Sequence, residues 1–397
     1  MTKTAAVIGA GPAGLMAAEV LSAGGMAVTV YDRMPSAGRK FLMAGRGGLN
    51  LTHSESLDPF LARYGAASAR LEPMLAAFPP RALIDWANAL GARTFTGSSG
   101  RIFPKAMKAS PLLRAWLDRL NRQDVQFRLR HDWRGWSGGA LRFHTSTGDV
   151  AETHDVTVLA LGGASWPRLG ADGGWATLLA EKGVAIAPLR PANMGFDVDW
   201  SEIFRARFAG QPLKNVVLRF GEHAARGDAM ITRYGLEGGA VYALSSALRD
   251  ALPTALAVDL RPDLSEQQIA SRLARPKAKE SLANYLRKSL GLSPLEINLL
   301  RETGMSPDRL KSVAVTLTGH QPLARAISTA GGISFDAVDD TLMLKAIPGT
   351  FVVGEMLDWE APTGGYLLQA CFSTAVFAAR AILKEQDATP TARISPA

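Results

Sequence analysis

Apolar positions near the start of the chain follow two different periods. Residues 5–8 are a short continuous apolar run and 28–31 a short run rich in β-branched residues, and between them apolar residues recur at helical spacing from 15 to 21. A continuous apolar run indicates a strand buried on both faces, whereas helical spacing indicates an amphipathic helix. The pattern therefore predicts a βαβ unit of about thirty residues.

Similar patterns continue along the chain. Helices are predicted near 80–90 and 111–120, and strands at 125–129, 141–145 and 156–161, the last of which we expect to rejoin the N-terminal sheet. From about 188, short alternating runs at 215–220 and 255–260 predict a small β-rich domain, followed by short helices at 266–273, 279–290 and 307–313. A strand at 349–354 and a long helix at 366–384 complete the pattern.

Size and composition fit a folded chain with two domains. The 397 residues include 47% hydrophobic and 20% charged residues, and exceed what one core usually organises. The single cysteine, Cys371, lies in an apolar helical pattern and excludes an internal disulfide or cysteine-based zinc site. Because we see neither a signal peptide nor an apolar run of about 20 residues, we expect a soluble cytoplasmic protein without a membrane partner.

Charge leaves two interpretations open. The formal net charge of +8 would attract phosphates or nucleic acid, but it is also compatible with general arginine usage. Residues 101–134 hold nine Lys or Arg against three Asp, and the helical stretch of the β-rich domain adds Arg272, Arg275, Lys277, Lys279, Arg287 and Lys288. A nucleic-acid partner is one interpretation of these clusters and a solvated basic face is the alternative, and no RNA-binding module is visible in the sequence.

A glycine turn joins the first strand to the first helix. Gly9 permits the tight turn, Gly11 lets a pyrophosphate approach the backbone, and Gly14 allows close packing of helix on strand. The helix N-terminus supplies free N–H groups, and an acid at the end of the second strand can accept ribose hydroxyls. The cofactor-binding residues predicted here are Gly9, Gly11, Pro12, Ala13, Gly14, Asp32 and Arg33.

Two further glycine-rich stretches favour FAD over NAD. The segment 38–51 adds three cations, including Arg46, that suit a cofactor longer than one nucleotide. Near the C-terminus a strand ends in acids, and a glycine pair then opens a long helix whose amides can face a flavin. The predicted cofactor residues are Gly38, Arg39, Lys40, Gly45, Gly47, Asn50, Leu51, Gly162, Gly163, Gly354, Glu355, Asp358, Gly364, Gly365 and Tyr366.

Across nearly its whole length the chain resembles the BaiN/RdsA family of bacterial FAD-dependent oxidoreductases. The motifs that carry the resemblance are residues 38–40 with 45–52, 100–104, 162–167, 329–332, and 354–355 with 364–369. The resemblance implies an α/β fold, a two-dinucleotide-fold-type (Rossmann-like) FAD-binding domain with an inserted β-barrel and a small helical domain. We expect FAD-binding parts at 1–189 and 331–385, an insert at 190–330 (barrel about 190–262, helices about 263–313) and a flexible tail at 386–397.

The resemblance also implies reduction of a carbon–carbon double bond by NADH or NADPH, a transient reductant. Substrates suggested by the family are bile-acid-like enones and uridine of ribosomal RNA. Leu49 stands where the family commonly has cysteine, and 232–239 also departs from its pattern, which indicates a distinct subfamily.

Catalytic residues are not fixed by the sequence. Tyr366, Tyr234 and His53 are candidate proton donors by residue type, and Arg101 and Lys105 are candidate substrate-binding residues. Two other functions stay open, a small-molecule ene-reductase or dehydrogenase and a non-catalytic flavin-binding regulatory protein. NADH or NADPH preference and oligomeric state are not predicted.

Overall fold

The structure is a computed structural model that describes residues 2–45, 47–274, 280–304 and 306–388. It divides into two compact units: Met1–Arg190 with Ser328–Ala397, and Pro191–Ile327. These limits lie within three residues of the predicted insert, 190–330. Arg46, Arg275, Lys277, Lys279 and most of the predicted tail lie outside the described residues.

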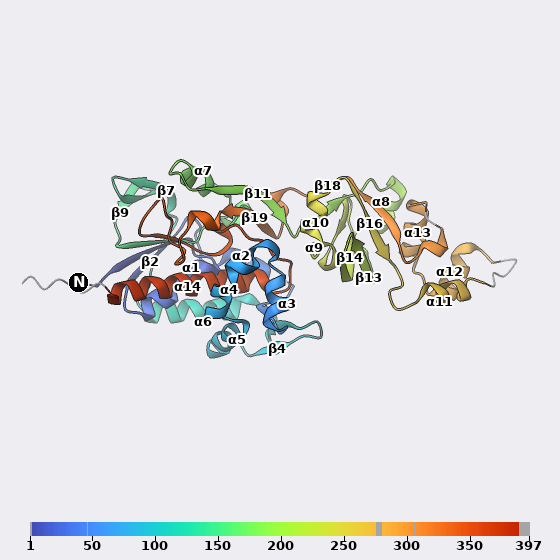
Figure 1. The fold of residues 1–397 in the computed structure, drawn as a ribbon, viewed down its shortest axis with the longest axis horizontal. Coiled ribbons are helices and arrows are strands. Elements are labelled where there is room, and N and C mark those ends of the chain that lie inside the picture. The colour runs from blue at the N-terminus through green and yellow to red at the C-terminus, as the bar shows by residue number, and fades with distance from the viewer. Residues whose placement is uncertain (1, 46, 275–279, 305, 389–397) are drawn as a thin grey trace, which may run out of the picture. The chain divides into compact units, whose positions relative to one another are not determined.

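The first unit is built on a five-stranded parallel sheet of order β20-β10-β1-β2-β6. The predicted return of the strand at 156–161 is confirmed, because β10 pairs with β1. Figure 1 shows α1, α6 and α14 below this sheet and the β7–β8–β9 sheet above it. The bounds are β1 Thr4–Ile8, α1 Pro12–Ala23, β2 Ala27–Asp32, α6 Ala109–Arg122, β6 Gln126–Leu129, β7 Asp132–Ser137, β8 Ala140–Thr145, β9 Gly148–Glu152, β10 Val156–Leu159, β20 Thr350–Val352 and α14 Tyr366–Ala388.

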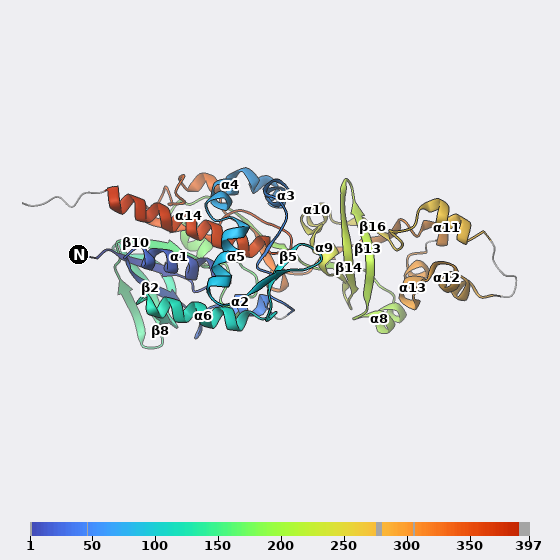
Figure 2. The ribbon, with the colours of Figure 1, turned by 90° about the horizontal axis from the view of Figure 1, so that it is seen from below.

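Helix α14 is long and apolar enough to cross a membrane by length and composition alone. It belongs to the core instead, since 61% of its most apolar window is buried and its core residues include Ala370, Phe372 and Val376. The expectation that no apolar run reaches membrane length therefore missed this helix. Figures 1 and 2 show α14 running beside α1, which forms part of the same core.

Smaller elements complete the first unit. A three-stranded antiparallel sheet of order β3-β5-β4 includes β3, which directly follows the second glycine-rich stretch. Strands β11 and β19 pair where the chain passes into the inserted unit and returns. The bounds are α2 Arg39–Ala44, β3 Thr52–His53, α3 Leu57–Ala62, α4 Ser68–Ala77, α5 Pro80–Ala89, β4 Thr94–Thr96, β5 Arg101–Pro104, α7 Trp175–Ala180, β11 Ile186–Ala192 and β19 Ser328–Ile333.

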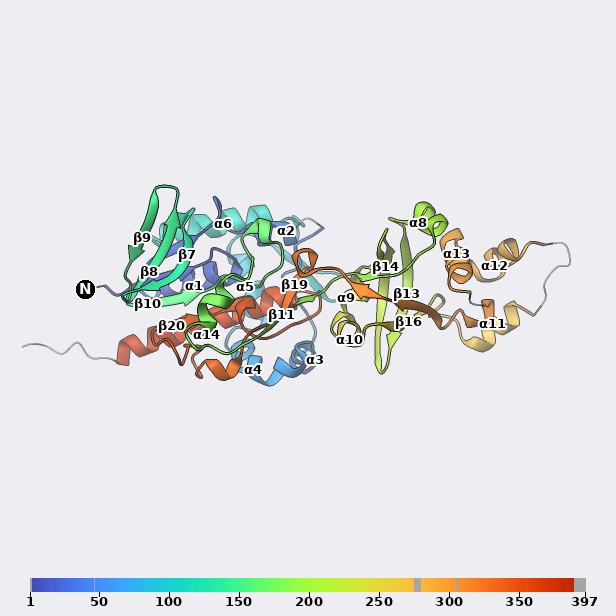
Figure 3. The same cartoon turned by 90° about the horizontal axis from the view of Figure 1, so that it is seen from above.

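The inserted unit is a seven-stranded antiparallel sheet of order β17-β16-β13-β14-β15-β12-β18, with helices between β16 and β17 (Figure 3). The predicted helix at 307–313 is wrong: only Pro307–Arg309 forms a 3-10 turn, and Val313 begins β17, where buried and exposed residues alternate. The bounds are β12 Phe196–Asp197, α8 Glu202–Phe208, β13 Pro212–Phe220, β14 His223–Ile231, β15 Gly235–Glu237, α9 Gly239–Tyr242, α10 Ser245–Asp250, β16 Thr254–Asp259, α11 Glu266–Arg272, α12 Leu282–Leu290, α13 Pro294–Glu302, β17 Val313–Leu317 and β18 Gly319–His320.

Candidate functional site

The glycine turn after β1 has the geometry of a phosphate site. A Cβ added to Gly14 would lie 1.9 Å from the carbonyl oxygen of Gly9, so the helix packs too closely on the turn for any side chain. A Cβ added to Gly11 meets nothing within 4 Å, which leaves open space before the first turn of α1. Gly11 caps that helix without a side-chain hydrogen bond, and Pro12 follows it. The first-turn amides of α1 are thus available to an anion.

Asp32 is fixed at the carboxyl end of β2 beside this turn. One of its carboxylate oxygens accepts a hydrogen bond of 2.7 Å from the Ala10 amide, and the other accepts one of 2.7 Å from the Met34 amide. Burial raises the pKa of Asp32 above its ordinary value, against the opposing effect of these two backbone bonds. The carboxylate therefore has one defined orientation, suited to accept ribose hydroxyls.

The side chain of Arg33, which follows Asp32, is engaged by two carboxylates. Its guanidinium forms ion pairs with Asp172 and, at 3.8 Å, with Asp132. The structure thus gives Arg33 a role in tying the end of β2 to neighbouring segments, and its predicted contact with a cofactor stays a prediction.

The second glycine-rich stretch lies against the first, because the Gly38 amide donates a 2.8 Å hydrogen bond to the Ala10 carbonyl. Around it, three buried side-chain atoms have no hydrogen-bond partner among the described residues: Arg39 Nε, Asn50 Oδ1 and Thr52 Oγ1. Buried polar atoms are normally hydrogen-bonded, so such a group is what a bound polar ligand would satisfy.

The remaining residues of this stretch shape its backbone. Gly45 ends α2 and packs against Ala109, while a Cβ on Gly47 would meet nothing within 4 Å. Leu51 is fully buried, and its amide donates a 2.9 Å bond to the Ile102 carbonyl of β5. These contacts anchor the loop to the β3–β5–β4 sheet.

The C-terminal motif reaches the same place as the N-terminal one. A Cβ added to Gly354 would lie 2.8 Å from the Cβ of Ala13 in α1. The Lys40 ammonium lies 2.9 Å from a Glu355 carboxylate oxygen and 3.0 Å from the Ser165 hydroxyl. Residues far apart in sequence therefore share one charged contact beside the glycine turn.

Glu355 is held on every side. Its other oxygen accepts a 2.9 Å bond from the Thr329 amide, and the Gly163 amide approaches to 3.3 Å. Gly162 is fixed by the Trp175 indole, which donates to its carbonyl at 2.9 Å. Asp358 is half-buried, and burial raises the pKa of its carboxyl. Glu355 therefore positions the two glycines and Lys40 as well as carrying charge.

The glycine pair at 364–365 brings the start of α14 onto β3. A Cβ on Gly365 would lie 2.5 Å from the Cα of Thr52, and Gly364 is covered by the Tyr366 ring. The Tyr366 hydroxyl donates a 2.6 Å hydrogen bond to Glu55, whose other oxygen lies 2.9 Å from Arg63. The amino-terminal end of α14 thus begins in a tyrosine–glutamate–arginine cluster.

Protonation in this cluster is defined by its contacts. Burial raises the pKa of Tyr366, and its hydrogen bond to the Glu55 carboxylate raises it further. Burial also raises the pKa of Glu55, but hydrogen bonds from Arg63 and Tyr366 outweigh it and hold that pKa below its ordinary value. Tyr366 is accordingly a neutral phenol whose hydrogen is directed at an ionised carboxylate.

The other two proton-donor candidates, His53 and Tyr234, lie in different units. His53 stacks on Tyr366, with ring centroids 5.6 Å apart, and both of its ring nitrogens are engaged, by the Ser99 carbonyl and the Glu55 amide. Tyr234 lies in the inserted unit, where its hydroxyl donates to Glu237. The structure brings two of the three candidates together, and their catalytic roles remain predictions.

The substrate-binding candidates lie on β5 and directly after it. Arg101 is half-buried opposite His53 in the β3–β5 register, and Lys105 is exposed. Neither side chain forms an ion pair with a residue that the structure describes.

Several residues of the site were missed from the sequence: Glu55, Arg63, Ser165 and Thr329. Glu55 is 311 positions from Tyr366 and 8 from Arg63, spacings that carry no local signal. Thr329 and Ser165 lie inside motifs that carried the family resemblance, but no residue pattern distinguished them as ligands of Lys40 or Glu355.

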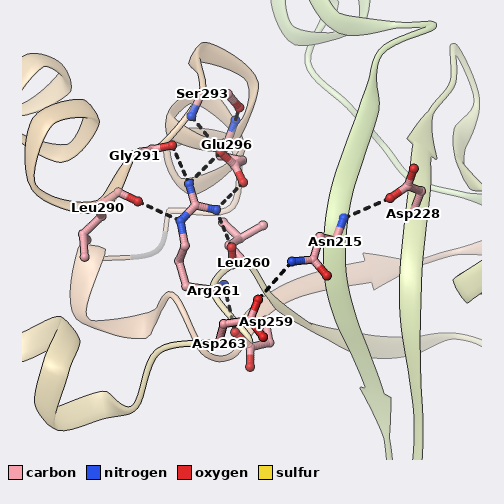
Figure 4. Close-up of polar contacts among 10 residues, drawn as sticks. All are labelled: Asn215, Asp228, Asp259, Leu260, Arg261, Asp263, Leu290, Gly291, Ser293 and Glu296. Carbon is pink, nitrogen blue, oxygen red and sulfur yellow. Dashed lines mark hydrogen bonds and ion pairs between the residues drawn. The ribbon is translucent and has the colours of Figure 1, made fainter.

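A pocket of about 250 Å³ lies in the inserted unit, lined by Lys214, Asn215, Arg261 and Asp263 among others. Its charges are already partnered, as Figure 4 shows: Arg261 donates to the Leu290 and Gly291 carbonyls at 2.8 and 2.7 Å and to Glu296 at 2.6 Å. These contacts connect the strand β16 to the helices α12 and α13, so the pocket edge is primarily structural.

The first unit fits FAD by its own chemistry. The space before α1 and the free amides suit a pyrophosphate, and Asp32 suits a ribose. The buried atoms of Arg39, Asn50 and Thr52 that lack a partner among the described residues lie in α2, in the segment after it and in β3. FAD, when bound, supplies hydride-transfer chemistry.

Comparison with known proteins identifies the family. The family model for the HI0933-like protein Rossmann domain matches residues 3–381. The ribosomal RNA dihydrouridine synthase of Escherichia coli K12 is 25% identical over 390 residues, covering 94% of this chain and 96% of that protein. The 3-dehydro-bile acid delta(4,6)-reductase of Clostridium scindens is 26% identical over 403 residues, covering 94% and 98%.

Solved structures agree on the fold. A flavocytochrome c3 fumarate reductase matches with a TM-score of 0.51 and 16% identity, covering 96% of this chain and 78% of that one. The 3-ketosteroid-delta4-(5alpha)-dehydrogenase of Rhodococcus jostii RHA1 matches with a TM-score of 0.50 and 13% identity, covering 96% of each chain. With the family match over almost the whole chain, the protein belongs to the HI0933-like Rossmann-domain family and is an FAD-dependent oxidoreductase.

Proposed function

We propose that the protein uses NADH or NADPH to reduce an electron-poor carbon–carbon double bond, and that its substrate is uracil in ribosomal RNA, converted to dihydrouridine. The observation that carries the RNA substrate is the placement, beside the cofactor loops, of cations that form no ion pair with any residue the structure describes. Arg101 and Lys105 belong to the strand region that anchors Leu51 at the end of the second glycine-rich stretch. A cation without a carboxylate partner is available to a phosphate.

Two relatives support the same reaction. Both ribosomal RNA dihydrouridine synthases, from Escherichia coli and from Haemophilus influenzae, match at 25% and 24% identity over at least 94% of this chain. The bile acid reductase of Clostridium scindens is named for a different substrate class. The shared element of these names is reduction, and the cationic strand region favours the RNA substrate.

The chain's own groups have defined tasks in this proposal. Reduction adds a hydride and a proton across the double bond, and the nicotinamide is the source of the hydride. Because the Tyr366 hydrogen is directed at Glu55 and the phenol pKa is raised, Tyr366 keeps its proton and acts as a positioning residue at the start of α14. Water then supplies the proton that completes the reduction.

The nicotinamide part has its own test. The sequence contains no second Gly-x-Gly-x-x-Gly fingerprint in a strand–helix context, so the proposal has the nicotinamide dock transiently beside the flavin. Purified protein mixed anaerobically with NADH or NADPH should lose its flavin absorbance. If neither nucleotide bleaches the flavin while dithionite does, the nicotinamide assignment fails.

The RNA substrate is tested in cells. Ribosomal RNA from cells that lack the gene is compared with RNA from cells complemented with the wild type or with Gly11→Ala, a variant designed to impair cofactor binding. We expect one or more dihydrouridines to be lost on deletion, restored by the wild type and not by the variant. An unchanged dihydrouridine content of ribosomal RNA in the deletion strain would contradict the RNA assignment.

A small-molecule ene-reductase is the second candidate, favoured by the match to the bile acid reductase over 94% of this chain. The RNA function and the small-molecule function are distinguished by mixing the reduced protein separately with a steroid-type enone and with unmodified ribosomal RNA. Turnover of the enone with no dihydrouridine formed would favour the small-molecule function.

A further inference from the structure

One face of the β3–β5–β4 sheet gathers aromatic rings and cations. In the strand register Phe95 lies opposite Phe103, and His53 lies opposite Arg101. Because side chains alternate along a strand and directly paired residues share a face, these four side chains lie on the same face of the sheet. We name His53, Phe95, Arg101 and Phe103 the aromatic face.

The opposite face of the sheet faces the core. Thr52 is 0% exposed and Ile102 is 3% exposed, and Pro104 is also buried. Phe95, in contrast, is 39% exposed, and its ring centroid is 5.9 Å from that of Phe103, tilted by 31°. The phenylalanine pair is therefore a surface feature and not part of a core.

The surroundings of this face carry uncompensated positive charge. The Lys105 amide donates to the Arg93 carbonyl at 2.7 Å. This hydrogen bond extends the β4–β5 pairing by one residue on each strand, and both of these residues are cations. Between Trp86 and Leu117 the chain contains no acidic residue and five cations, Arg93, Arg101, Lys105, Lys108 and Arg114. None of the five forms an ion pair within the described part of the chain, so this field is open to an anionic partner.

The aromatic face also adjoins the cofactor loops. A Cβ added to Gly48, in the second glycine-rich stretch, would lie 3.7 Å from the Phe103 ring. At the other edge of the face, His53 stacks on Tyr366 at the start of α14. A polymer lying along this face would have one of its units beside the flavin site.

We propose that the aromatic face binds a single-stranded segment of RNA, with bases stacked on Phe95 and Phe103 and phosphates contacted by Arg93, Arg101 and Lys105. This rests on the proposed RNA substrate and adds that the RNA is held unpaired. Single strands are bound by aromatic stacking combined with a basic groove, whereas duplex RNA is recognised mainly by shape and backbone. The exposed ring of Phe95, the half-buried ring of Phe103 beside it, and cations that form no ion pair with any described residue together fit the first mode.

The test measures binding without turnover, using the purified FAD-bound protein and a fluorescently labelled ribosomal RNA fragment, single-stranded or annealed to its complement. Phe95→Ala should weaken single-strand binding by about 5- to 150-fold, the range for loss of one stacked base, and leave duplex binding unchanged. Arg93→Gln with Lys105→Gln should lower the slope of log affinity against log salt by about 1.4. Flavin content and thermal melting should match the wild type in both variants.

Arg142→Gln is the control, because Arg142 is an exposed cation on β8, away from β5 in the same unit (Figure 2), and its ion pair with Asp149, at 3.4 Å, distinguishes it from Arg93 and Lys105. It removes one charge and should measurably change neither the affinity for single-stranded RNA nor the slope of log affinity against log salt. Equal binding by Phe95→Ala and wild type, equal loss in Arg142→Gln and in the double variant, or no binding of single-stranded RNA by the wild type would each overturn the assignment of this face.

The two proposals fail in different ways. If the wild type binds RNA as described but forms no dihydrouridine, the proposed reaction fails and the binding face stands. If the wild type forms dihydrouridine while Phe95→Ala binds and reacts normally, the reaction stands and the binding face fails.

Discussion

The side-chain ammonium of Lys40 lies 2.9 Å from a carboxylate oxygen of Glu355, which joins two residues 315 positions apart. This contact closes the cofactor site between the N-terminal and C-terminal parts of the first unit. Both side chains are largely covered, with exposed fractions of 25% for Lys40 and 13% for Glu355. An ion pair in such a place is costly to break from one side only.

Lys40→Met should therefore destabilise the apoprotein by up to about 3 kcal/mol and lower its flavin content, because Glu355 would keep its charge without a partner. The double variant Lys40→Met with Glu355→Gln should recover part of the stability, which a thermal melt of each protein will show. Additive losses in the double variant would contradict a direct Lys40–Glu355 interaction.

Gly11→Ala and Gly14→Ala should separate cofactor binding from folding. A methyl group on Gly14 would collide with the Gly9 carbonyl, so Gly14→Ala should lower the melting temperature of the apoprotein. A methyl group on Gly11 meets nothing in the apoprotein but occupies the space before α1, so its melting temperature should be unchanged while FAD affinity falls. Isothermal titration of both apoproteins with FAD checks this, and normal FAD affinity in Gly11→Ala would refute the phosphate site.

The Glu55 cluster predicts a specific dependence on pH. The pKa of Glu55 is lowered in the folded protein, so its contribution to stability is complete above its unfolded pKa of about 4.3 and is lost as the pH falls through the folded value. Glu55→Gln should cost about 1 kcal/mol near neutral pH and much less below about pH 4. The measurement is the difference in melting temperature between variant and wild type across pH. A difference that stays constant would show that Glu55 ionisation is not involved.

Arg261 and Glu296 predict a stability effect confined to the inserted unit. Their side chains are 18% and 10% exposed and share two hydrogen bonds. Arg261→Met should destabilise the unit by about 3 kcal/mol and speed hydrogen exchange in α13, whereas Lys214→Met, which breaks an exposed pair with Asp228, should cost at most about 1 kcal/mol. Equal exchange in the two variants would contradict the structural role of Arg261.

Local patterns sufficed for the parts of the fold that depend on neighbouring residues. The glycine turn, the βαβ unit and the return of β10 to the sheet follow from short apolar runs and glycine spacing. The predicted helix at 307–313 failed because proline at its start favours a helical turn, while the buried alternation of Val313, Val315 and Leu317 decides for a strand.

Contacts between distant segments were beyond such patterns. The Tyr366–Glu55 hydrogen bond depends on Gly365 meeting the backbone of Thr52, a close approach that only the folded chain reveals. For the same reason the ion pairs of Arg33 with Asp132 and Asp172 could not be predicted from its place directly after Asp32.

The proposed reaction is tested most directly by a single turnover without nicotinamide. The protein is reduced anaerobically by light with EDTA as the electron donor, mixed with unmodified ribosomal RNA, and followed by flavin absorbance and by mass spectrometry of the digested RNA. The account predicts that the flavin is reoxidised and that dihydrouridine appears in equal amount. Flavin that stays reduced in the presence of RNA, yet is reoxidised by a steroid-type enone, would contradict it.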